Sequence, residues 1–377
     1  NDYTGHTRFR TNGARSFTSI ADLGVASSLG APTDVALGTV VFHAQSNYSD
    51  SLNYIGDGDS SNRNWQIASG GGGAFPAVAT LVNSGSGTLR ITGSITGTGG
   101  IAPISFSANT ADFELLGVIG DNATRPFSFT GSSTARRITL GGANTYAGDT
   151  TLGTATVRAP VLADIGVNSS FGTGSAAGRI TITGGVLSYT GAAVSTNRLW
   201  TLNNGTISND GTGALTLTGN IDLTGTGASL GGSYTGADNT VSGIIAGTGA
   251  LTSNGAATWL LTGANTRSGA INVHNGTLRA GNAAAFGTTT GITIDNGTLD
   301  LNGFALETTT LAGNGGTLAL GNANLTFNAG TGVTTSYAGT ITGTGGIIKL
   351  GASTQTLTGS NQYTGDTTIG GGTLALN

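Results

Sequence analysis

The chain has 377 residues, of which 68 are glycine, 37% are hydrophobic and none is cysteine, and its formal net charge is −4. Only 8% of the residues are charged, against about 25% in an ordinary globular domain, but the supply of aliphatic and β-branched residues predicts an ordered chain rather than a disordered one. This composition excludes disulfides, cysteine-bound zinc and thiol chemistry, and the single lysine, Lys349, argues against nucleic-acid binding, which needs a concentrated basic surface.

A five-residue phrase that begins with asparagine recurs along the chain and leads each time into a run rich in threonine and aliphatic residues. Its copies are residues 1–5, 144–148, 265–269 and 361–365. Recurrence over the whole length is typical of stacked-repeat proteins, so we expect a single continuous solenoid over residues 1–377. The repeat units are residues 1–143, 144–264 and 265–360, followed by the partial unit 361–377.

The asparagine that opens each phrase is interpreted as a structural turn residue rather than a ligand-binding one. The four residues are Asn1, Asn144, Asn265 and Asn361. Asparagine tolerates left-handed corners, and amide side chains stacked coil upon coil form hydrogen-bonded ladders. We therefore expect these residues to support the stacking of the coils.

Residues 43–76 form the most polar and aromatic segment of the first unit, and the strand pattern lapses there. We expect this segment to be a loop insertion that projects from the coils or covers one of them. Aromatic rings beside aspartate and arginine also match the residue types that hold sugar rings. The candidate ligand-contact residues are Tyr48, Tyr54, Asp57, Asp59, Arg63 and Trp65. The alternative is a plain loop that Trp65 packs onto a coil.

Residues 57–62 have the beginning of a calcium-binding loop. The EF-hand pattern requires glycine at its sixth position and glutamate at its twelfth, where this chain has Asn62 and Ala68. The pattern therefore fails, and a polar surface loop is the favoured interpretation, with ion binding at 57–62 left open.

Short segments in which aliphatic and polar residues alternate strictly occur along the chain. They include residues 89–91, 180–182, 215–217 and 299–301. Side chains of period two point to opposite faces of a strand, so the aliphatic residues are expected to line one continuous core. In the last third the threonines of these strands recur every 16 to 23 residues, a spacing that fits one circuit of a β-solenoid and is too short for a propeller blade of about 40–45 residues.

Catalytic patterns are weak. Carbohydrate-active enzymes need a pair of carboxylates gathered over the substrate, and the nearest acidic pair of the C-terminal half, Asp295 and Asp300, lies five residues apart. His6, Arg8 and Arg10 alternate on one strand face and are expected to be solvated. We find no nucleophile elbow and no histidine spacing suited to a metal, so we expect no enzymatic activity, no cofactor and no metal.

Threonine pairs separated by one residue, such as Thr181 and Thr183, are similar to the flat arrays of ice-binding solenoids. Such arrays need coils of nearly equal length to keep their rows in register, and the unequal spacing of the threonine strands works against that. Threonine is also simply a favoured exposed residue in strands. Ice binding is therefore a minor alternative.

Residues 345–376 resemble the autotransporter-associated β-strand repeat, also called the passenger-associated transport repeat. The resemblance depends on the phrase Asn361-Gln-Tyr-Thr-Gly-Asp-Thr367 and the strands around it, and residues 135–152 contain a second copy. A third copy opens at Thr258 and departs from the pattern, with Arg267 in the tyrosine position and Ile271 in place of a threonine. The resemblance implies a right-handed parallel β-helix, exposed on a bacterial surface or shed from it.

We therefore expect an all-β fold, a right-handed parallel β-helix (β-solenoid) with irregular coils of about 16–23 residues. The expected function is that of an extracellular structural or adhesive repeat protein that forms a rigid surface stalk or fibre, as a segment of a longer chain or an end-to-end polymer. Expected partners are neighbouring repeats or further copies, surface glycans and other cells, without nucleic acid. The sequence contains no run of about 18 apolar residues, the length that would predict a membrane-spanning helix. The alternatives are a carbohydrate-active β-helix enzyme and a glycan- or ice-binding solenoid.

Overall fold

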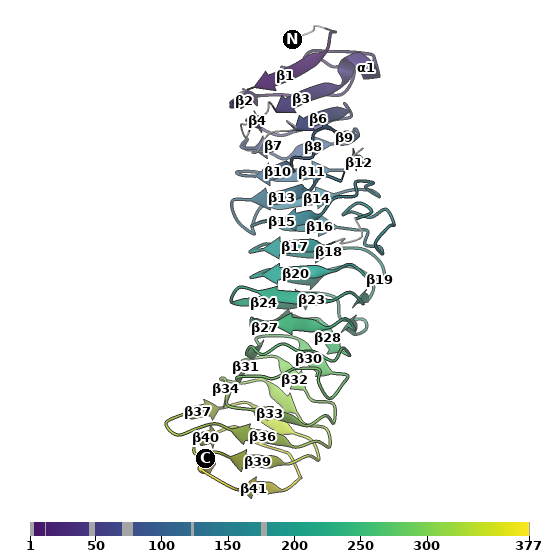
Figure 1. The fold of residues 1–377 in the computed structure, drawn as a ribbon. Coiled ribbons are helices and arrows are strands. Elements are labelled where there is room, and N and C mark those ends of the chain that lie inside the picture. The colour runs from purple at the N-terminus through teal and green to yellow at the C-terminus, as the bar shows by residue number, and fades with distance from the viewer. Residues whose placement is uncertain are drawn as a thin grey trace. The chain divides into compact units, whose positions relative to one another are not determined.

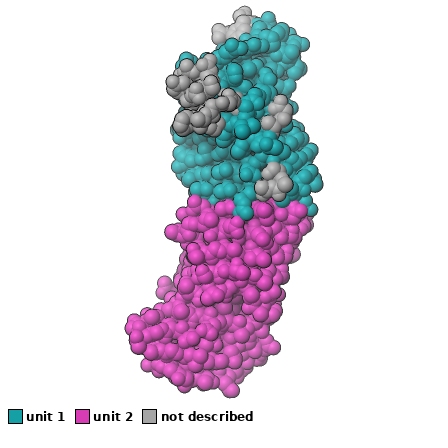
Figure 2. Space-filling view, in the orientation of Figure 1, with its two compact units in different colours: residues 1–191 teal, residues 192–377 magenta. Residues whose placement is uncertain are grey.

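The structure, a computed structural model, describes residues 4–11, 13–44, 50–69, 78–121, 124–174 and 179–376. Tyr48 and Asn1 lie outside these residues. The chain divides into two compact units, residues 1–191 and 192–377 (Figure 2). Each unit consists of short strands stacked in parallel, one coil upon the next (Figure 1). The predicted all-β solenoid is therefore confirmed.

Unit 1 has three sheets, named A, B and C here. Sheet A contains β1 (Thr7–Thr11), β3 (Val40–Ala44), β6 (Trp65–Ser69), β9 (Ile95–Gly99) and β12 (Ile119–Asp121). The unit 1 strands of sheet B are β2 (Ala14–Phe17), β4 (Asp50–Tyr54), β7 (Ala79–Asn83), β10 (Ile104–Ala108), β13 (Phe127–Gly131), β15 (Thr150–Leu152) and β17 (Ile180–Thr183). Those of sheet C are β5 (Asp59–Ser61), β8 (Leu89–Ile91), β11 (Phe113–Leu115), β14 (Arg137–Leu140), β16 (Thr156–Ala159) and β18 (Val186–Tyr189).

Unit 2 repeats the stacking with other strands. Its longest sheet, named sheet E here, contains β19 (Val194–Thr196), β22 (Leu215–Leu217), β25 (Asn239–Val241), β28 (Thr258–Leu261), β30 (Thr277–Ala280), β32 (Thr298–Asp300), β35 (Thr317–Ala319) and β38 (Thr340–Thr342). A second row contains β21 (Thr206–Asn209), β24 (Gly227–Gly232), β27 (Ala250–Gly255), β29 (Ile271–Val273), β31 (Ile292–Ile294) and β34 (Leu311–Ala312). The remaining rows are β20 (Trp200–Asn203), β23 (Ile221–Thr224) and β26 (Ile245–Gly247); β33 (Leu306–Thr308), β36 (Leu325–Asn328), β39 (Ile347–Leu350) and β41 (Thr367–Ile369); and β37 (Thr334–Tyr337), β40 (Thr354–Leu357) and β42 (Thr373–Leu376).

Helix is almost absent from the described residues. The single helix α1 (Val35–Gly38) is capped by the side chain of Asp34, which accepts hydrogen bonds from the N–H groups of Ala36 and Leu37. Among the described residues no helix has the length and apolar character needed to cross a membrane.

Coil length differs between the two units. In unit 2 one of the shortest coils runs from Leu299 to its partner Leu318 on the next strand of the stack, and one of the longest runs from Ile221 to Ile245. In unit 1 the coil that begins at Ala14 does not reach its partner on the next strand until Ser51. The expected coil length therefore describes unit 2 closely, whereas unit 1 contains longer coils.

The alternating strands form the core as predicted. The ten aliphatic residues chosen from the alternation are each at most 1% exposed: Leu89, Ile91, Ile180, Ile182, Leu215, Leu217, Leu299, Leu301, Leu318 and Leu320. The polar residues between them face outward, as Arg90 and Thr216 do. Full burial of each aliphatic side chain contributes about 1.5–3 kcal/mol, so repeated coils accumulate stability without crosslinks.

Glycine at the coil corners is required by close stacking of the backbone. A Cβ on Gly117 would lie 2.0 Å from the carbonyl oxygen of Gly93, one coil earlier, and a Cβ on Gly243 would lie 2.1 Å from that of Gly219. Any larger residue would force the coils apart at these corners. The high glycine content therefore reflects tight corners rather than a flexible linker.

The segment predicted as an insertion, residues 43–76, is described in part. Its described residues include strands β4, β5 and β6, which pair with strands of the neighbouring coils. Residues 45–49 and 70–77 lie outside the described residues.

Candidate functional site

Three of the predicted ligand-contact residues lie in the interior. Tyr54 and Arg63 are 0% exposed and Trp65 is 1% exposed, so they offer no contact surface, and their assignment as ligand-contact residues is corrected. Tyr54 follows Leu52 by two residues on β4, and the alternation turns both side chains inward. Burial, together with a hydrogen bond to Asp59, raises the pKa of Tyr54 to about 12.

The guanidinium of Arg63 has a structural role. Its Nε donates to the carbonyl of Gly38 (2.6 Å), one terminal nitrogen to the carbonyl of Leu29 (2.8 Å), and the other to the Thr7 hydroxyl (3.2 Å). It therefore fastens the loop between β2 and β3 to the next coil along the chain, to which Arg63 belongs. Arginine is rarely buried, but two main-chain carbonyls and the Thr7 hydroxyl accept hydrogen bonds from its donors here.

The two aspartates of the same set lie at a coil corner. Asp57 is exposed and accepts a hydrogen bond from the Ser86 hydroxyl (2.7 Å), while Asp59 accepts one from the N–H of Ile20 (3.1 Å). Both carboxylates therefore brace neighbouring coils. Among the described residues no cluster of three metal-ligating side chains occurs, so ion binding at 57–62 gains no support.

The repeated asparagine bridges three consecutive coils. Asn144 is 0% exposed; its Oδ1 accepts from the N–H of Ile119 in the preceding coil (2.8 Å), and its Nδ2 donates to the carbonyl of Ser170 in the following coil (2.8 Å). Asn265 makes the equivalent bonds to Ile245 (2.7 Å) and Ala285 (2.5 Å). The amide thus satisfies main-chain groups that the turn would otherwise leave unpaired.

Asn361 is partly exposed and accepts a hydrogen bond from the N–H of Ile341 (3.1 Å). The acceptor half of the bridge is therefore the same in all three described copies of the turn. Together these bonds support the predicted structural role of the asparagine.

The tyrosine two residues after the asparagine is part of the same turn. The hydroxyl of Tyr146 lies 3.0 Å from the Thr150 hydroxyl, and that of Tyr363 lies 2.7 Å from the Thr367 hydroxyl. The ring of Tyr146 also packs, tilted by 33°, against Phe127 of the preceding coil, with ring centroids 4.2 Å apart. The phrase Asn-x-Tyr-x-Gly-Asp-Thr therefore encodes one turn in which the side chains of asparagine, tyrosine and threonine have defined hydrogen-bond partners.

Arg267 replaces the tyrosine in the copy that departs from the pattern. It is 0% exposed, and its terminal nitrogens donate to the carbonyls of Phe286 (2.9 Å) and Ala270 (2.6 Å). Burial lowers its pKa to about 10. Ile271 occupies the place of the threonine, so the pair has changed together from tyrosine–threonine to arginine–isoleucine.

Two of the asparagine turns, those at Asn144 and Asn265, also anchor a loop of the next coil. The N–H of Thr173 donates to the carbonyl of Tyr146 (2.8 Å), and that of Thr288 donates to the carbonyl of Arg267 (2.9 Å). The preceding glycines, Gly172 and Gly287, have positive φ angles of 64° and 61°. The Phe-Gly-Thr segments at residues 171–173 and 286–288 are therefore the points at which a side loop contacts the asparagine turn of the preceding coil.

Two side loops of unit 1, residues 18–39 and 160–174, share a detailed geometry. In each, a serine hydroxyl donates to a carbonyl three residues later, from Ser27 in the first loop (3.2 Å) and from Ser169 in the second (2.9 Å). Each presents a half-exposed valine after a glycine of positive φ, Val25 at 52% and Val167 at 53% exposure. The solenoid thus displays similar loops at equivalent places.

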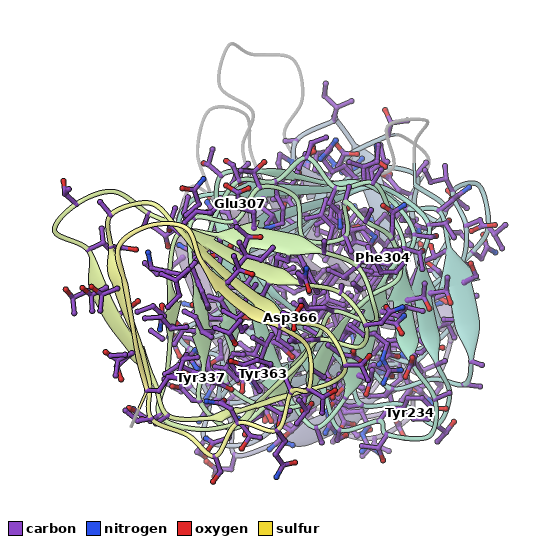
Figure 3. The ribbon with its side chains drawn as sticks, turned by 90° about the horizontal axis from the view of Figure 1, so that it is seen from below. Tyr234, Phe304, Glu307, Tyr337, Tyr363 and Asp366 are labelled. Atoms are coloured by element: carbon purple, nitrogen blue, oxygen red, sulfur yellow. The ribbon has the colours of Figure 1, made fainter. Side chains whose placement is uncertain are left out.

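Carboxylates of unit 2 that lie near one another are held by a basic side chain. Asp295 pairs with His274 (2.7 Å), and Asp238 and Asp300 both pair with Arg279 (2.7 Å each). Glu307 and Asp366 lie apart when the unit is seen from below (Figure 3). These described carboxylates therefore do not form the unneutralised pair that glycoside hydrolysis requires.

The surface hollows of the described residues are shallow and lack an acidic pair. One of about 550 Å³ is lined by residues that include His6, Arg8 and Phe9. Another of about 430 Å³ contains a single carboxylate, Glu307, whose oxygen accepts a hydrogen bond from Asn328 (2.9 Å).

A rank of threonines runs along sheet E. Its members, in register on successive strands, are Thr258, Thr277, Thr298, Thr317 and Thr340. Two residues further along each strand, the next row of outward-facing positions is mixed and contains Leu260, Arg279, Asp300, Ala319 and Thr342. Because a flat array of paired threonine ranks does not form, this face argues against ice binding.

Comparison with known proteins agrees with this geometry. The model of the passenger-associated transport repeat matches residues 137–159, 251–280 and 347–376, and these segments contain the three described asparagine turns. The chain is 46% identical over 385 residues to the adhesin BmaC autotransporter of Brucella suis biovar 1 (strain 1330). That alignment covers 100% of the chain and 11% of the relative, so the chain spans about a tenth of the relative's length. No solved structure is significantly similar to the chain. The chain therefore contains passenger-associated transport repeats at each of its three described asparagine turns.

Proposed function

We propose that this chain is part of the extracellular passenger of a bacterial surface adhesin. In this proposal the solenoid is a rigid scaffold that keeps its contact loops and its exposed sheet faces at a distance from the cell. The observation that carries the proposal is the recurring link between an asparagine turn and the loop of the next coil, as in Asn144 and residues 160–174. A scaffold that fixes loops at repeated places suits contact with a surface better than chemistry in a pocket.

The role is non-enzymatic. The ion-paired carboxylates of unit 2 and the shallow hollows of the described residues support this proposal, and so does the name of the relative, which describes an adhesin. Contact with surface glycans or other cells is part of the proposal.

A bead assay tests adhesion directly. Beads coated with the purified 377-residue chain should bind cultured animal cells several-fold more than albumin-coated beads do. A variant in which residues 163–168 are replaced by a glycine–serine linker keeps Asn144 and Ser170, and it should bind less while retaining its circular dichroism spectrum. Equal binding by coated and albumin beads would contradict the adhesive role.

End-to-end association stays a prediction. Light scattering after size-exclusion chromatography tests it, because a dilute preparation that remains at 36.9 kDa would contradict it.

A further inference from the structure

Two arginines lie on the outer face of sheet C in unit 1, and a third lies at the corner that precedes one of them. Arg137 on β14 lies opposite Thr156 on β16, and Thr139 lies opposite Arg158, so Arg137 and Arg158 are diagonal neighbours. In parallel strands about 4.8 Å apart, with a rise of about 3.3 Å per residue, such neighbours have Cα atoms about 8 Å apart. Arg136 precedes Arg137 at the corner, and its terminal nitrogen donates to the carbonyl of Thr110 (2.5 Å).

The arginines are only partly neutralised. Asp112 lies 3.9 Å from the Nε of Arg137 and accepts a hydrogen bond from that residue's N–H (2.9 Å). Glu114, the other carboxylate on this face, pairs with Arg90 (2.5 Å). Within the described residues, Asp112 is therefore the one carboxylate that forms an ion pair with any of the three arginines, in a chain with only 8% charged residues.

The repeats themselves provide a matched comparison. Arg158 lies fourteen residues after Asn144, and Arg279 lies fourteen residues after Asn265. Arg279 is bound on both sides, by Asp300 (2.7 Å) and Asp238 (2.7 Å). Arg158 instead lies between Thr139 and Ser188 on the adjacent strands, is exposed, and has no ion pair within the described part of the chain.

We infer that Arg136, Arg137 and Arg158 form a docking surface for a linear sulfated polysaccharide. Guanidinium groups bind sulfate through charge-assisted hydrogen bonds of fixed geometry. The Arg137 side chain is 55% exposed, and the face is a stack of parallel strands about 4.8 Å apart, which presents cations along a line rather than in a pocket. A linear polymer with regularly spaced anions matches this arrangement in charge and shape. The inference rests on the proposed adhesive function and names the chemistry of one contact.

Heparin is the probe for the test. The purified chain should bind immobilised heparin at low salt, and the double variant R137Q/R158Q should bind about tenfold more weakly because two exposed charge-assisted contacts are lost. The control R279Q removes the equivalent arginine of unit 2 and should change the affinity less than about twofold, since its carboxylates already occupy that guanidinium. Circular dichroism melting checks that all variants are folded.

Four outcomes would overturn the inference: no binding to heparin, equal binding by R137Q/R158Q, equal binding to fully desulfated heparin, or equal binding to a DNA duplex of similar charge. The bead assay keeps the two proposals separate. Coated beads that adhere to cells when the chain does not bind heparin would refute the sulfated glycan and leave adhesion standing. Heparin binding without adhesion would refute the adhesive role.

Discussion

Unit 1 and unit 2 share the same strand alternation but differ in coil regularity. Successive coils of unit 2 have similar lengths, while the coil of unit 1 that runs from Ala14 to Ser51 is much longer than any of them. The additional residues of unit 1 lie in side loops such as residues 18–39, which Arg63 fastens to the next coil along the chain. The comparison shows that loops can be added without disturbing strand register, provided that a buried polar group satisfies the main chain where the loop returns.

The units also differ in where they place their cations. In unit 2 three of the four arginine and lysine residues, Arg198, Arg267 and Lys349, are buried, and Arg279 is the one arginine or lysine on the described surface of this unit. Among the described residues of unit 1, eight arginines are not buried: Arg8, Arg10, Arg15, Arg90, Arg136, Arg137, Arg158 and Arg179. Contacts with anions are therefore expected on unit 1.

The largest expected effect tests whether the core follows one rule in both units. Replacing Leu217 by Asp places an unpaired carboxylate at a position that is 0% exposed, and it should cost about 3–5 kcal/mol of unfolding free energy. The matched change in unit 1, Ile91 to Asp, should cost a similar amount. Urea unfolding followed by circular dichroism measures both costs. The control is Thr216 to Asp on the outer face, which should change the unfolding free energy by no more than about 0.5 kcal/mol. A tolerated Leu217 substitution would contradict the shared core.

Next in size is the effect of the buried arginine in unit 2. Replacing Arg267 by Ala leaves the carbonyls of Phe286 and Ala270 without their donor and opens a cavity, at a cost of about 2–4 kcal/mol of unfolding free energy, measured by urea unfolding. The partly exposed Arg279 should cost less than about 1 kcal/mol when changed to Ala. Equal costs for the two substitutions would show that the carbonyl contacts of Arg267 do not stabilise the turn.

The asparagine turns allow a direct comparison of bonding. Asn144 makes two buried side-chain hydrogen bonds to main-chain groups, so its change to Ala should cost about 2 kcal/mol. The partly exposed Asn361 has one such bond to Ile341, and its change to Ala should cost less than about 1 kcal/mol. Hydrogen exchange should show faster opening of β12, which begins with Ile119, in the first variant. Unchanged exchange there would argue against the bridge.

The smallest effect concerns pH. Burial raises the pKa of Tyr54 from 10.0 to about 12, so the unfolded chain releases its phenolic proton first, and stability should fall as the pH rises from about 10 towards 12. Burial raises the pKa of Tyr337 in unit 2 in the same direction. Urea unfolding at pH 9 and pH 11 should show a shallower pH dependence for Tyr54 to Phe than for the unchanged chain. An identical slope would exclude Tyr54 as a source of alkaline destabilisation.

Much of the fold was predictable because its signals are local. The alternation in residues 215–217 and 299–301 identified core positions, and the asparagine phrase located the turns. The candidate contact residues were predicted less well, because polar and aromatic composition suggested a surface where Tyr54, Arg63 and Trp65 are buried. The period-two pattern was present in the short runs Leu52-Asn-Tyr54 and Trp65-Gln-Ile67, and it was the signal that could have placed Tyr54 and Trp65 correctly.

The sequence by itself determined the repeat family, the strand alternation and the structural role of the asparagine turns, because these depend on the intrinsic geometry of neighbouring residues. Only the tertiary structure decided which side chains meet across coils. Arg158 and Arg279 occupy the same repeat position, yet Ser188 faces the first on the following strand and Asp300 faces the second. That difference depends on the number of residues in the intervening coil, which sets the register, and register determines whether an arginine is neutralised or remains available.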